Sequence, residues 1–360
     1  MKIDVDFSLA LNDRTGKLFL GRDIIAALGE RVSSVRYGRF ACVPSIDLLR
    51  RIAGRLTHNE TKGRVANSSL VAMLPLIREA NPTLHLDPLS VVRHKLLPSD
   101  AVLCHDVGPI THPQYFGPLI EAFYVSAYGK IRDAKPHMVF VSGTSQREFH
   151  RLFGDDYASS TVIYIPTRLG VRVGEETRPE GVERPFLLTV GSIGDRKNQR
   201  RSIEAFAASG LAEKGWRYAV VGGPEPGAEA VIRLAESTPG VVRLGYVTDS
   251  ELRWLYRNAS GFVLMSLLEG FGMPVIEATE YDLPCLVSRS GILSEVGGEA
   301  VLQADPEDIA SIAAGMRRLA DLPQGERTTR IAQARAHLRR FEREPILDQW
   351  RDLGDRITAA

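Results

Sequence analysis

Short apolar runs recur at regular spacing through the second half of the chain. Runs such as FLLTV, YAVV and GFVLM are each bounded by glycine, proline or charged residues and are typical of buried strands. Stretches of roughly 10–15 residues with helical spacing separate them, a pattern that predicts parallel βαβ units. Ligands of such sheets bind beyond the carboxyl ends of the strands, so the residues that follow each run are the first candidates for a site.

The second half resolves into alternating strands and helices. A Thr-x-x-Glu capping box, Thr248 and Glu251, marks the start of one of the helices. Strands are expected at 186–192, 217–223, 241–247, 261–266 and 284–288, and helices at 198–209, 227–238, 249–259, 274–281 and 306–322.

The first half alternates less clearly. Strands are expected at 2–9, 100–106, 136–143 and 160–166, and helices at 21–30 and 145–154. A stretch rich in glycine, proline and charge follows them and indicates an interdomain linker. The predicted organisation is an N-terminal domain (1–170), a linker (171–185), a C-terminal domain (186–340) and a final helix (341–360).

Length and composition favour a two-domain globular protein. The chain has 360 residues, of which 44% are hydrophobic and 25% charged. Its net charge of +1 does not indicate the excess of basic residues that is typical of nucleic-acid-binding proteins. The three cysteines lie far apart without metal-ligand spacing, which favours reduced residues in a cytosolic protein. No signal-peptide pattern and no apolar run long enough to span a membrane is present. We expect a cytoplasmic protein, with peripheral contact at the inner face of the membrane left open.

One loop carries two carboxylates. In SLLEGFGMPVIEAT, Glu269 and Glu277 bracket a turn that leads from a strand into a helix. A helix start offers unpaired N–H groups and a positive dipole end to an anion, and carboxylates accept hydrogen bonds from hydroxyl groups. This combination suits a phosphate between two polyhydroxy parts, as in a nucleotide sugar. A plain turn with solvated glutamates is the alternative.

A second loop carries two cations. In TVGSIGDRKNQR, Arg196 and Lys197 follow a strand and precede a helix, without the Gly-Lys-Ser/Thr of a P-loop. The segment alone could be a solvated basic loop. Paired with the Glu269 loop in one sheet, it is better explained as the binding site of a diphosphate.

The first half offers weaker candidates. His105 and Asp106 end a predicted strand, and His105 could take part in hydrogen bonds or carry charge near neutral pH. His112 follows without the context of a zinc site, so no metal is expected. Gly16, next to Lys17, could let the backbone approach a ligand or form a plain turn.

These segments resemble family 4 glycosyltransferases of the GT-B fold. The stretch GYVTDSELRWLYRNASGFVLMSLLEGFGMPVIEA looks like the signature region with its Glu-x7-Glu motif, and VGSIGDRKN resembles the diphosphate loop. AVLCHDVGPITHPQYF and VFVSGTSQREF resemble segments of bacterial mannosyltransferase-like members. The likeness runs from the first strand to about residue 320, and the first loop departs from the family in holding a single glycine, Gly16.

The resemblance implies an α/β architecture of two Rossmann-like domains whose parallel sheets face each other across a cleft, with the C-terminal helix crossing back to the first domain. It implies catalytic roles for His105, Glu269, Lys197 and Arg196. It also implies donor-binding roles for a larger set: Gly16, Tyr246, Val247, Gly270, Phe271, Gly272, Met273 and Glu277. In this set Glu277 would hold the ribose, and Tyr246 and Val247 would lie near the base.

The predicted activity is retaining transfer of a hexose from a nucleotide diphosphate sugar to an acceptor hydroxyl, without a cofactor or metal. GDP-mannose is the first choice of donor, with GDP-fucose or a UDP-sugar as alternatives. The expected acceptor is a bacterial surface glycan, free or lipid-linked. A non-catalytic nucleotide-sugar-binding protein is the rival hypothesis; an epimerase or dehydrogenase would need a dinucleotide fingerprint that the sequence lacks. The basic stretch RTTRIAQARAHLRRF is either a solvated helix face or a contact for anionic lipid.

Overall fold

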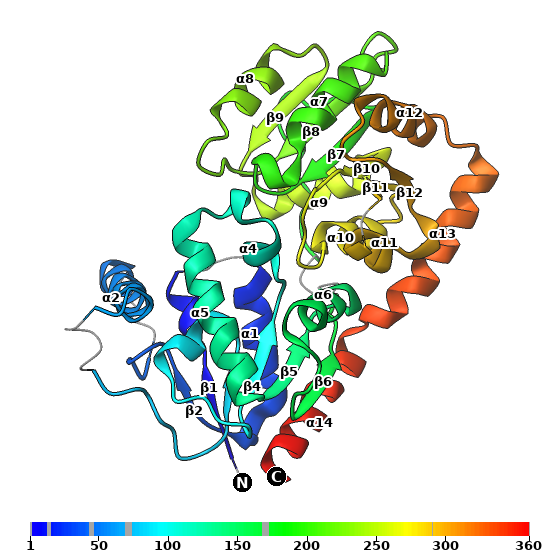
Figure 1. The fold of residues 1–360 in the computed structure, drawn as a ribbon. Helices are drawn as coiled ribbons and strands as arrows, with labels where there is room; N and C mark the ends of the chain where they lie inside the picture. Colours follow the sequence, from blue (N-terminus) through cyan, green and yellow to red (C-terminus); the bar gives the residue numbers. More distant parts are fainter. Residues whose placement is uncertain are drawn as a thin grey trace. The chain divides into compact units, whose positions relative to one another are not determined.

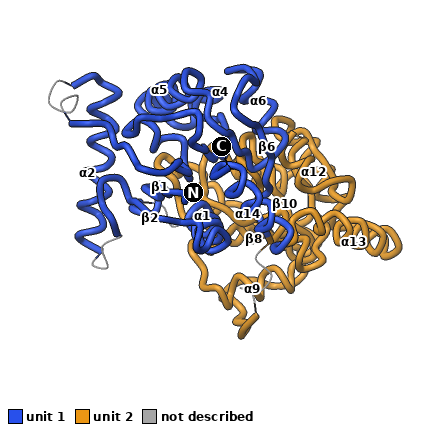
Figure 2. The backbone as a smooth tube through the Cα atoms, turned by 90° about the horizontal axis from the view of Figure 1, so that it is seen from below, with its two compact units in different colours: residues 1–166, 343–360 blue, residues 167–342 orange. Residues whose placement is uncertain are grey.

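The computed structural model describes residues 2–12, 16–42, 47–68, 74–167, 173–289 and 291–359 and divides into two compact units. Unit 1 comprises residues 1–166 and 343–360, and unit 2 comprises residues 167–342 (Figure 2). Each unit holds a six-stranded sheet in which every neighbouring pair of strands is parallel. The predicted α/β class with two parallel sheets is confirmed.

The sheet of unit 1 has the order β2-β1-β3-β4-β5-β6 (Figure 1). Its strands are β1 (Ile3–Asp6), β2 (Val32–Arg36), β3 (Thr83–His85), β4 (Ala101–Cys104), β5 (His137–Phe140) and β6 (Ser159–Val162). Its helices are α1 (Gly16–Leu28), α2 (Asp47–Val65), α4 (Gly108–Thr111), α5 (Pro118–Ala134), α6 (Gly143–Phe153) and α14 (Arg343–Ala359). The strand order reverses direction between β1 and β3, which makes this position the topological switch point of the unit.

The sheet of unit 2 has the order β12-β11-β10-β7-β8-β9. Its strands are β7 (Phe186–Val190), β8 (Arg217–Val221), β9 (Val241–Gly245), β10 (Gly261–Leu264), β11 (Cys285–Ser288) and β12 (Leu302–Ala304). Its helices are α7 (Gln199–Ala208), α8 (Glu229–Ser237), α9 (Asp249–Asn258), α10 (Met273–Glu280), α11 (Gly291–Gly297), α12 (Ile309–Ala320) and α13 (Gln324–Leu338). This is the dinucleotide-fold order, and its switch point lies between β7 and β10.

Apolar strand residues hold the sheet of unit 2 to its helices. Val220 and Val263 pack with Ile203 and Phe206 of α7 and Met316 of α12, and all five side chains are at most 1% exposed. Burying a side chain of this size stabilises the fold by about 1.5–3 kcal/mol. This core fixes the strands whose carboxyl ends carry the two candidate loops.

Local signals set several helix ends. At the start of α9 the Thr248 backbone N–H donates to the Glu251 carboxylate (2.8 Å), and the Glu251 N–H donates to the Thr248 hydroxyl (3.3 Å), so the predicted capping box is confirmed. Helix α1 ends before Gly29, whose φ of +51° suits glycine.

The last helix belongs to unit 1. Helix α14 packs against α1, and Arg343 makes two hydrogen bonds to the Asp23 carboxylate (2.7 and 2.8 Å) while Arg31 binds Asp355 (2.6 and 2.9 Å).

Residues 173–185 form no helix or strand, and residues 171–172 of the predicted linker lie outside the described residues. Across the described ranges, no helix is both long and apolar enough to cross a membrane.

Candidate active site

The two predicted loops of unit 2 meet at its switch point. Strands β7 and β10 pair side by side, so the segments that follow them, 191–198 and 265–272, leave the same edge of the sheet. The backbone N–H of Leu267 donates to the Arg196 carbonyl (2.9 Å), and the side-chain amide of Asn198 donates to the Met265 carbonyl (3.0 Å). The loops therefore form one surface rather than two separate turns.

A buried ion pair joins them. The Lys197 ammonium lies 2.6 Å from Oε1 of Glu269, and the two side chains are only 10% and 7% exposed. The Ser266 hydroxyl donates to the same oxygen (2.7 Å), and Arg196 Nη1 lies 4.0 Å from Oε2. Burial alone would raise the pKa of Glu269, but Lys197, Arg196 and the Ser266 hydrogen bond outweigh it and hold this pKa below its usual value. Glu269 is thus a carboxylate with a buried cation beside it.

The other cation has its own acidic partner. Arg196 Nη2 donates to Oε1 of Glu225 (3.0 Å), and the Ser192 hydroxyl donates to the same oxygen (2.5 Å). The sequence analysis missed Glu225. Its position in the loop that follows β8, at the same edge of the sheet, is the signal that could have found it. Each cation of the loop is therefore held in place by a carboxylate from another segment.

The Glu269 loop leads into the start of α10. Gly272 is the residue before the helix and has a φ of +95°; a Cβ there would lie 2.5 Å from the Leu293 side chain, so the turn requires glycine. Gly272 has no side chain to cap the helix, Pro274 has no N–H, and the Val275 N–H donates to the Gly272 carbonyl (2.9 Å). The N–H groups of Gly272 and Met273 are therefore the ones that could serve an anion. Phe271 is 4% exposed and packs edge-on against Phe341, so its ring is a core element and only its backbone could serve a ligand.

Glu277 lies one turn into α10. It accepts a hydrogen bond from the hydroxyl of Tyr256 (2.9 Å), a residue of α9 that is 1% exposed and stacks on Tyr281. The sequence analysis missed Tyr256, because nothing in the local sequence links it to α10. The contact fixes the direction of the Glu277 side chain.

Tyr246 and Val247, the residues expected near the base, follow strand β9 of the unit 2 sheet. Tyr246 follows β9 and is 87% exposed, and its ring lies so close to Gly223 that a Cβ there would be 2.2 Å from the ring. Val247 is half-buried beside it, and Gly270 and Met273 are half-buried in the Glu269 loop. An exposed aromatic ring at the carboxyl end of a strand is a surface on which a flat base can stack.

His105 and Gly16 belong to unit 1. His105 follows β4, is 5% exposed and donates from Nε2 to the Leu86 carbonyl (3.2 Å). Burial, with a smaller contribution from Lys17, lowers the pKa of His105 to about 3, so the charged form considered from the sequence is wrong at neutral pH. Gly16 is the first residue of α1, and residues 13–15 of its loop lie outside the described residues.

The lowered pKa of His105 predicts a pH-dependent stability. Between the native pKa of about 3 and the ordinary value of 6.5, the unfolded chain binds a proton that the native protein does not, so the free energy of unfolding falls as pH drops below 6.5. One such histidine contributes a slope of about 1.4 kcal/mol per pH unit. We expect His105→Gln to reduce the slope measured by urea unfolding between pH 6.5 and pH 5, relative to a His112→Gln control. An unchanged slope would contradict the buried, neutral state.

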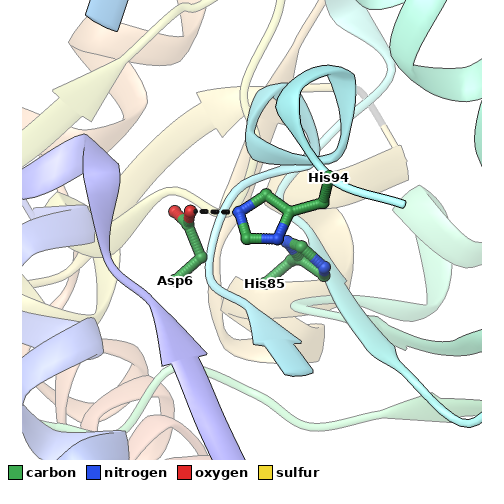
Figure 3. A group of neighbouring side chains, drawn as sticks. All are labelled: Asp6, His85 and His94. Carbon is green, nitrogen blue, oxygen red and sulfur yellow. Dashed lines mark hydrogen bonds and ion pairs between the residues drawn. The ribbon is translucent and has the colours of Figure 1, made fainter. Parts of the chain in front are cut away.

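One group of three metal-ligand side chains occurs among the described residues. Asp6, His85 and His94 are buried in unit 1, with ligand atoms within 4.8 Å of one another (Figure 3). Oδ2 of Asp6 is hydrogen-bonded to Nε2 of His94 (2.9 Å) and lies 3.9 Å from the Arg93 guanidinium. Because a fixed cation sits next to the only carboxylate, the cluster is better explained as an ion-pair network than as a metal site. It was not found from the sequence, since its members lie far apart along the chain.

The geometry of unit 2 suits one kind of ligand. Two cations and the start of α10 could serve an anion, while the carboxylates of Glu269 and Glu277 could accept hydrogen bonds from hydroxyl groups. The arginines of α13, by contrast, bind within unit 2: Arg327 to the Ser260 carbonyl, Arg330 to Glu326, and Arg335 to Asp282. The basic stretch thus has a structural role in unit 2.

Comparison with known proteins agrees with this geometry. Residues 175–337 match the family model described as "Glycosyl transferases group 1". The chain is 30% identical over 224 residues to the O-antigen chain mannosyltransferase B of Escherichia coli, a match that covers 58% of each chain. The chain thus spans little more than half the length of this relative.

Solved structures share the fold. A sucrose-phosphate synthase of Thermosynechococcus elongatus superposes with a TM-score of 0.70 at 18% identity, covering 100% of this chain and 99% of the other. Alr3699/HepE of Anabaena, solved in complex with UDP, superposes with a TM-score of 0.68 at 17% identity over 100% of both chains. The expected fold is thereby confirmed, and the family resemblance is supported over residues 175–337.

Proposed function

We propose that this chain, whose residues 175–337 match the model of the group 1 glycosyl transferases, moves a hexose from a nucleoside diphosphate sugar to an acceptor hydroxyl. The observation that carries the proposal is the buried Lys197–Glu269 pair at the switch point of unit 2, with Arg196 beside it. A cation and a carboxylate side by side match the two parts of such a donor, its diphosphate and its sugar.

The chemical difficulty of the reaction is the charge that develops on the leaving diphosphate. Lys197, Arg196 and the start of α10 would stabilise that charge, and both cations are already held in position by carboxylates. When the donor binds, its phosphates replace Glu269 as the partner of Lys197, and Glu269 turns to the sugar hydroxyls. The bond from the anomeric carbon to the diphosphate then breaks, the acceptor oxygen forms the new bond to that carbon, and the acceptor proton passes to the leaving diphosphate. We expect retention of configuration and no metal requirement, because protein cations neutralise the diphosphate.

The proposed donor is GDP-mannose and the proposed acceptor a bacterial surface glycan, free or lipid-linked. The mannosyltransferase names of the O-antigen relatives support this choice, with GDP-fucose and UDP-sugars as alternatives. The roles implied for His105 and Gly16, and peripheral contact with the cytoplasmic membrane, stay predictions.

A panel of nucleotide sugars tests the activity. With GDP-mannose, GDP-fucose and UDP-glucose, release of the nucleoside diphosphate is measured with and without a chelator, and NMR assigns the anomeric configuration of the product. We expect turnover of one donor, unaffected by the chelator. Binding of a nucleotide sugar without turnover, in the presence of acceptor glycans, would favour the rival non-catalytic protein.

Glu277 is predicted to act on binding rather than on the chemical step. If it holds the ribose, whose contacts are alike in the ground and transition states, Glu277→Gln should raise KM and weaken binding of the nucleoside diphosphate about tenfold with kcat little changed. Tyr256→Phe, which removes the hydroxyl that orients Glu277, should show a weaker form of the same effect. Steady-state kinetics and calorimetry measure both. A fall in kcat at unchanged KM would contradict the ribose role.

A further inference from the structure

A third loop of unit 2, between β8 and α8, lies against the loop that carries the two cations. The Ile193 N–H donates to the Gly223 carbonyl (2.8 Å), and the Glu225 N–H donates to the Ile193 carbonyl (2.8 Å). Gly222 has a φ of +140°, and a Cβ there would lie 2.0 Å from the Gly191 carbonyl oxygen. The two loops are thus in backbone contact, and this contact places Glu225 beside the cations.

The Glu225 carboxylate has a fixed orientation. Its Oε1 accepts hydrogen bonds from the Ser192 hydroxyl (2.5 Å) and from Nη2 of Arg196 (3.0 Å). A Cβ at Gly194 would lie 2.4 Å from Oε2, so the carboxylate fills the space above that glycine. The Arg196 and Glu225 side chains are 24% and 33% exposed, which leaves this pair accessible from solvent. Glu225 therefore holds Arg196 at a position that a ligand can reach.

The four charged side chains of the site balance one another. Arg196 is paired with Glu225, and Lys197 is paired with Glu269. A phosphate that binds Arg196 competes with Glu225 for the guanidinium and then lies near a carboxylate that Ser192 still holds in place. Like charges at such short range repel each other, and more strongly in a partly buried site than in water. The site thereby limits its own affinity for phosphate.

This repulsion acts unequally on substrate and product. In a nucleotide sugar the terminal phosphate is esterified by the sugar. In the released nucleoside diphosphate that phosphate is a monoester, whose second proton has a pKa of about 6. The product therefore carries more negative charge than the donor at neutral pH, and a fixed carboxylate next to the diphosphate repels the product more strongly.

We propose that Glu225 is a positioning residue that orients Arg196 toward the diphosphate, and that its negative charge promotes release of the nucleoside diphosphate product. The inference rests on the proposed glycosyltransferase function and adds the control of product release to it. Arg196 exchanges Glu225 for phosphate when the donor binds, and Glu225 takes Arg196 back when the product leaves. Release matters for turnover because it is the slow step of many enzymes.

A variant that removes the charge and keeps the shape tests the proposal. Glu225→Gln keeps an oxygen that can accept from Arg196 and Ser192, and Glu229→Gln, at an exposed position in the first turn of α8, is the matched control. Calorimetry with GDP and UDP measures affinity, and stopped-flow release of a fluorescent analogue of the bound nucleotide measures the dissociation rate. Glu225→Gln should bind the product about tenfold more tightly and release it about tenfold more slowly, with a smaller fall in KM for the donor. The control should match the wild type.

Two further measurements separate charge from structure. Raising the salt concentration from about 0.05 M to about 0.5 M should shrink the difference between Glu225→Gln and the wild type, because salt screens the repulsion. Glu225→Ala also frees Arg196, which must then be ordered when the ligand binds, so it should gain less affinity than Glu225→Gln. A merely structural Glu225 would lower the free energy of unfolding and leave product affinity and its salt dependence unchanged. Equal affinity in the alanine and glutamine variants would overturn the positioning role.

The outcomes distinguish this inference from the proposed function. If GDP or UDP binds the wild type and Glu225→Gln with equal affinity, the role in release is overturned while the proposed function stands. Weaker binding by Glu225→Gln would make Glu225 a direct contact of the ligand and would also overturn the role in release. An equal fall in donor KM and product affinity would overturn the discrimination between the two. If neither nucleotide binds the wild type, the proposed function fails and this inference fails with it.

Discussion

Replacing Lys197 by alanine is expected to lower turnover about 100- to 1,000-fold, the effect of removing one preorganised group that stabilises developing charge. The same substitution should also destabilise the ligand-free protein. Glu269 would stay buried at 7% exposure without its nearest cation, and breaking one side of a buried ion pair costs about 3–5 kcal/mol. Turnover at saturating donor and the free energy of urea unfolding measure the two effects separately.

Two variants keep these effects apart. Lys214→Ala removes an exposed lysine of the same unit and should change neither quantity. Lys197→Met combined with Glu269→Gln removes both charges while keeping the shape, so it should recover stability but not activity. Near wild-type turnover of Lys197→Ala at saturating donor would refute the role given to this lysine.

Glu269→Gln is expected to lower kcat by about two orders of magnitude or more, because the carboxylate acts at the sugar where charge develops. Affinity for the nucleoside diphosphate should be unchanged or higher, since the Lys197 ammonium loses a competing partner 2.6 Å away. The amide oxygen can still accept from Ser266, which keeps the loop in place. Glu269→Gln is thus expected to lower kcat and keep the affinity for the nucleoside diphosphate, whereas Glu277→Gln is expected to weaken that affinity and keep kcat.

Steady-state kinetics with the preferred donor and calorimetry with the nucleoside diphosphate give the two quantities for each glutamate variant. A loss of nucleoside diphosphate affinity that fully accounts for the lost activity of Glu269→Gln would contradict a role at the sugar. Loss of stability alone in both variants would make the two carboxylates structural.

The site of unit 2 was largely predictable from the sequence because its signals are local. Arg196 and Lys197 follow one buried strand, Glu269 follows another, and parallel topology brings the ends of such strands to one edge. The partners that orient these residues were not predictable. Tyr256 reaches Glu277 from a different helix, and Glu225 reaches Arg196 from the loop after β8, through contacts that no periodicity encodes.

Helix α2 shows why the first half gave weaker signals. Its apolar residues Leu48 and Leu56 are 66% and 56% exposed, whereas the polar residues Thr57, Glu60 and Thr61 are buried. Leu48, Ile52 and Leu56 recur at helical spacing but are exposed, so the apolar stripe of this helix does not mark its core-facing side. The buried polar positions have a use, since Thr61 accepts from Arg93 and Glu60 binds Arg39 and Arg64.

A calorimetric titration of the purified protein with GDP and with UDP tests the central claim most directly. If the two loops at the switch point of unit 2 form a donor site, one of these nucleoside diphosphates should bind saturably at one site per chain. The affinity should drop by at least about tenfold when Arg196 and Lys197 are both replaced, since hydrogen bonds to charged groups contribute about 1.5–3 kcal/mol each. Absence of binding by either nucleotide, or equal affinity in the doubly substituted protein, would contradict the assignment.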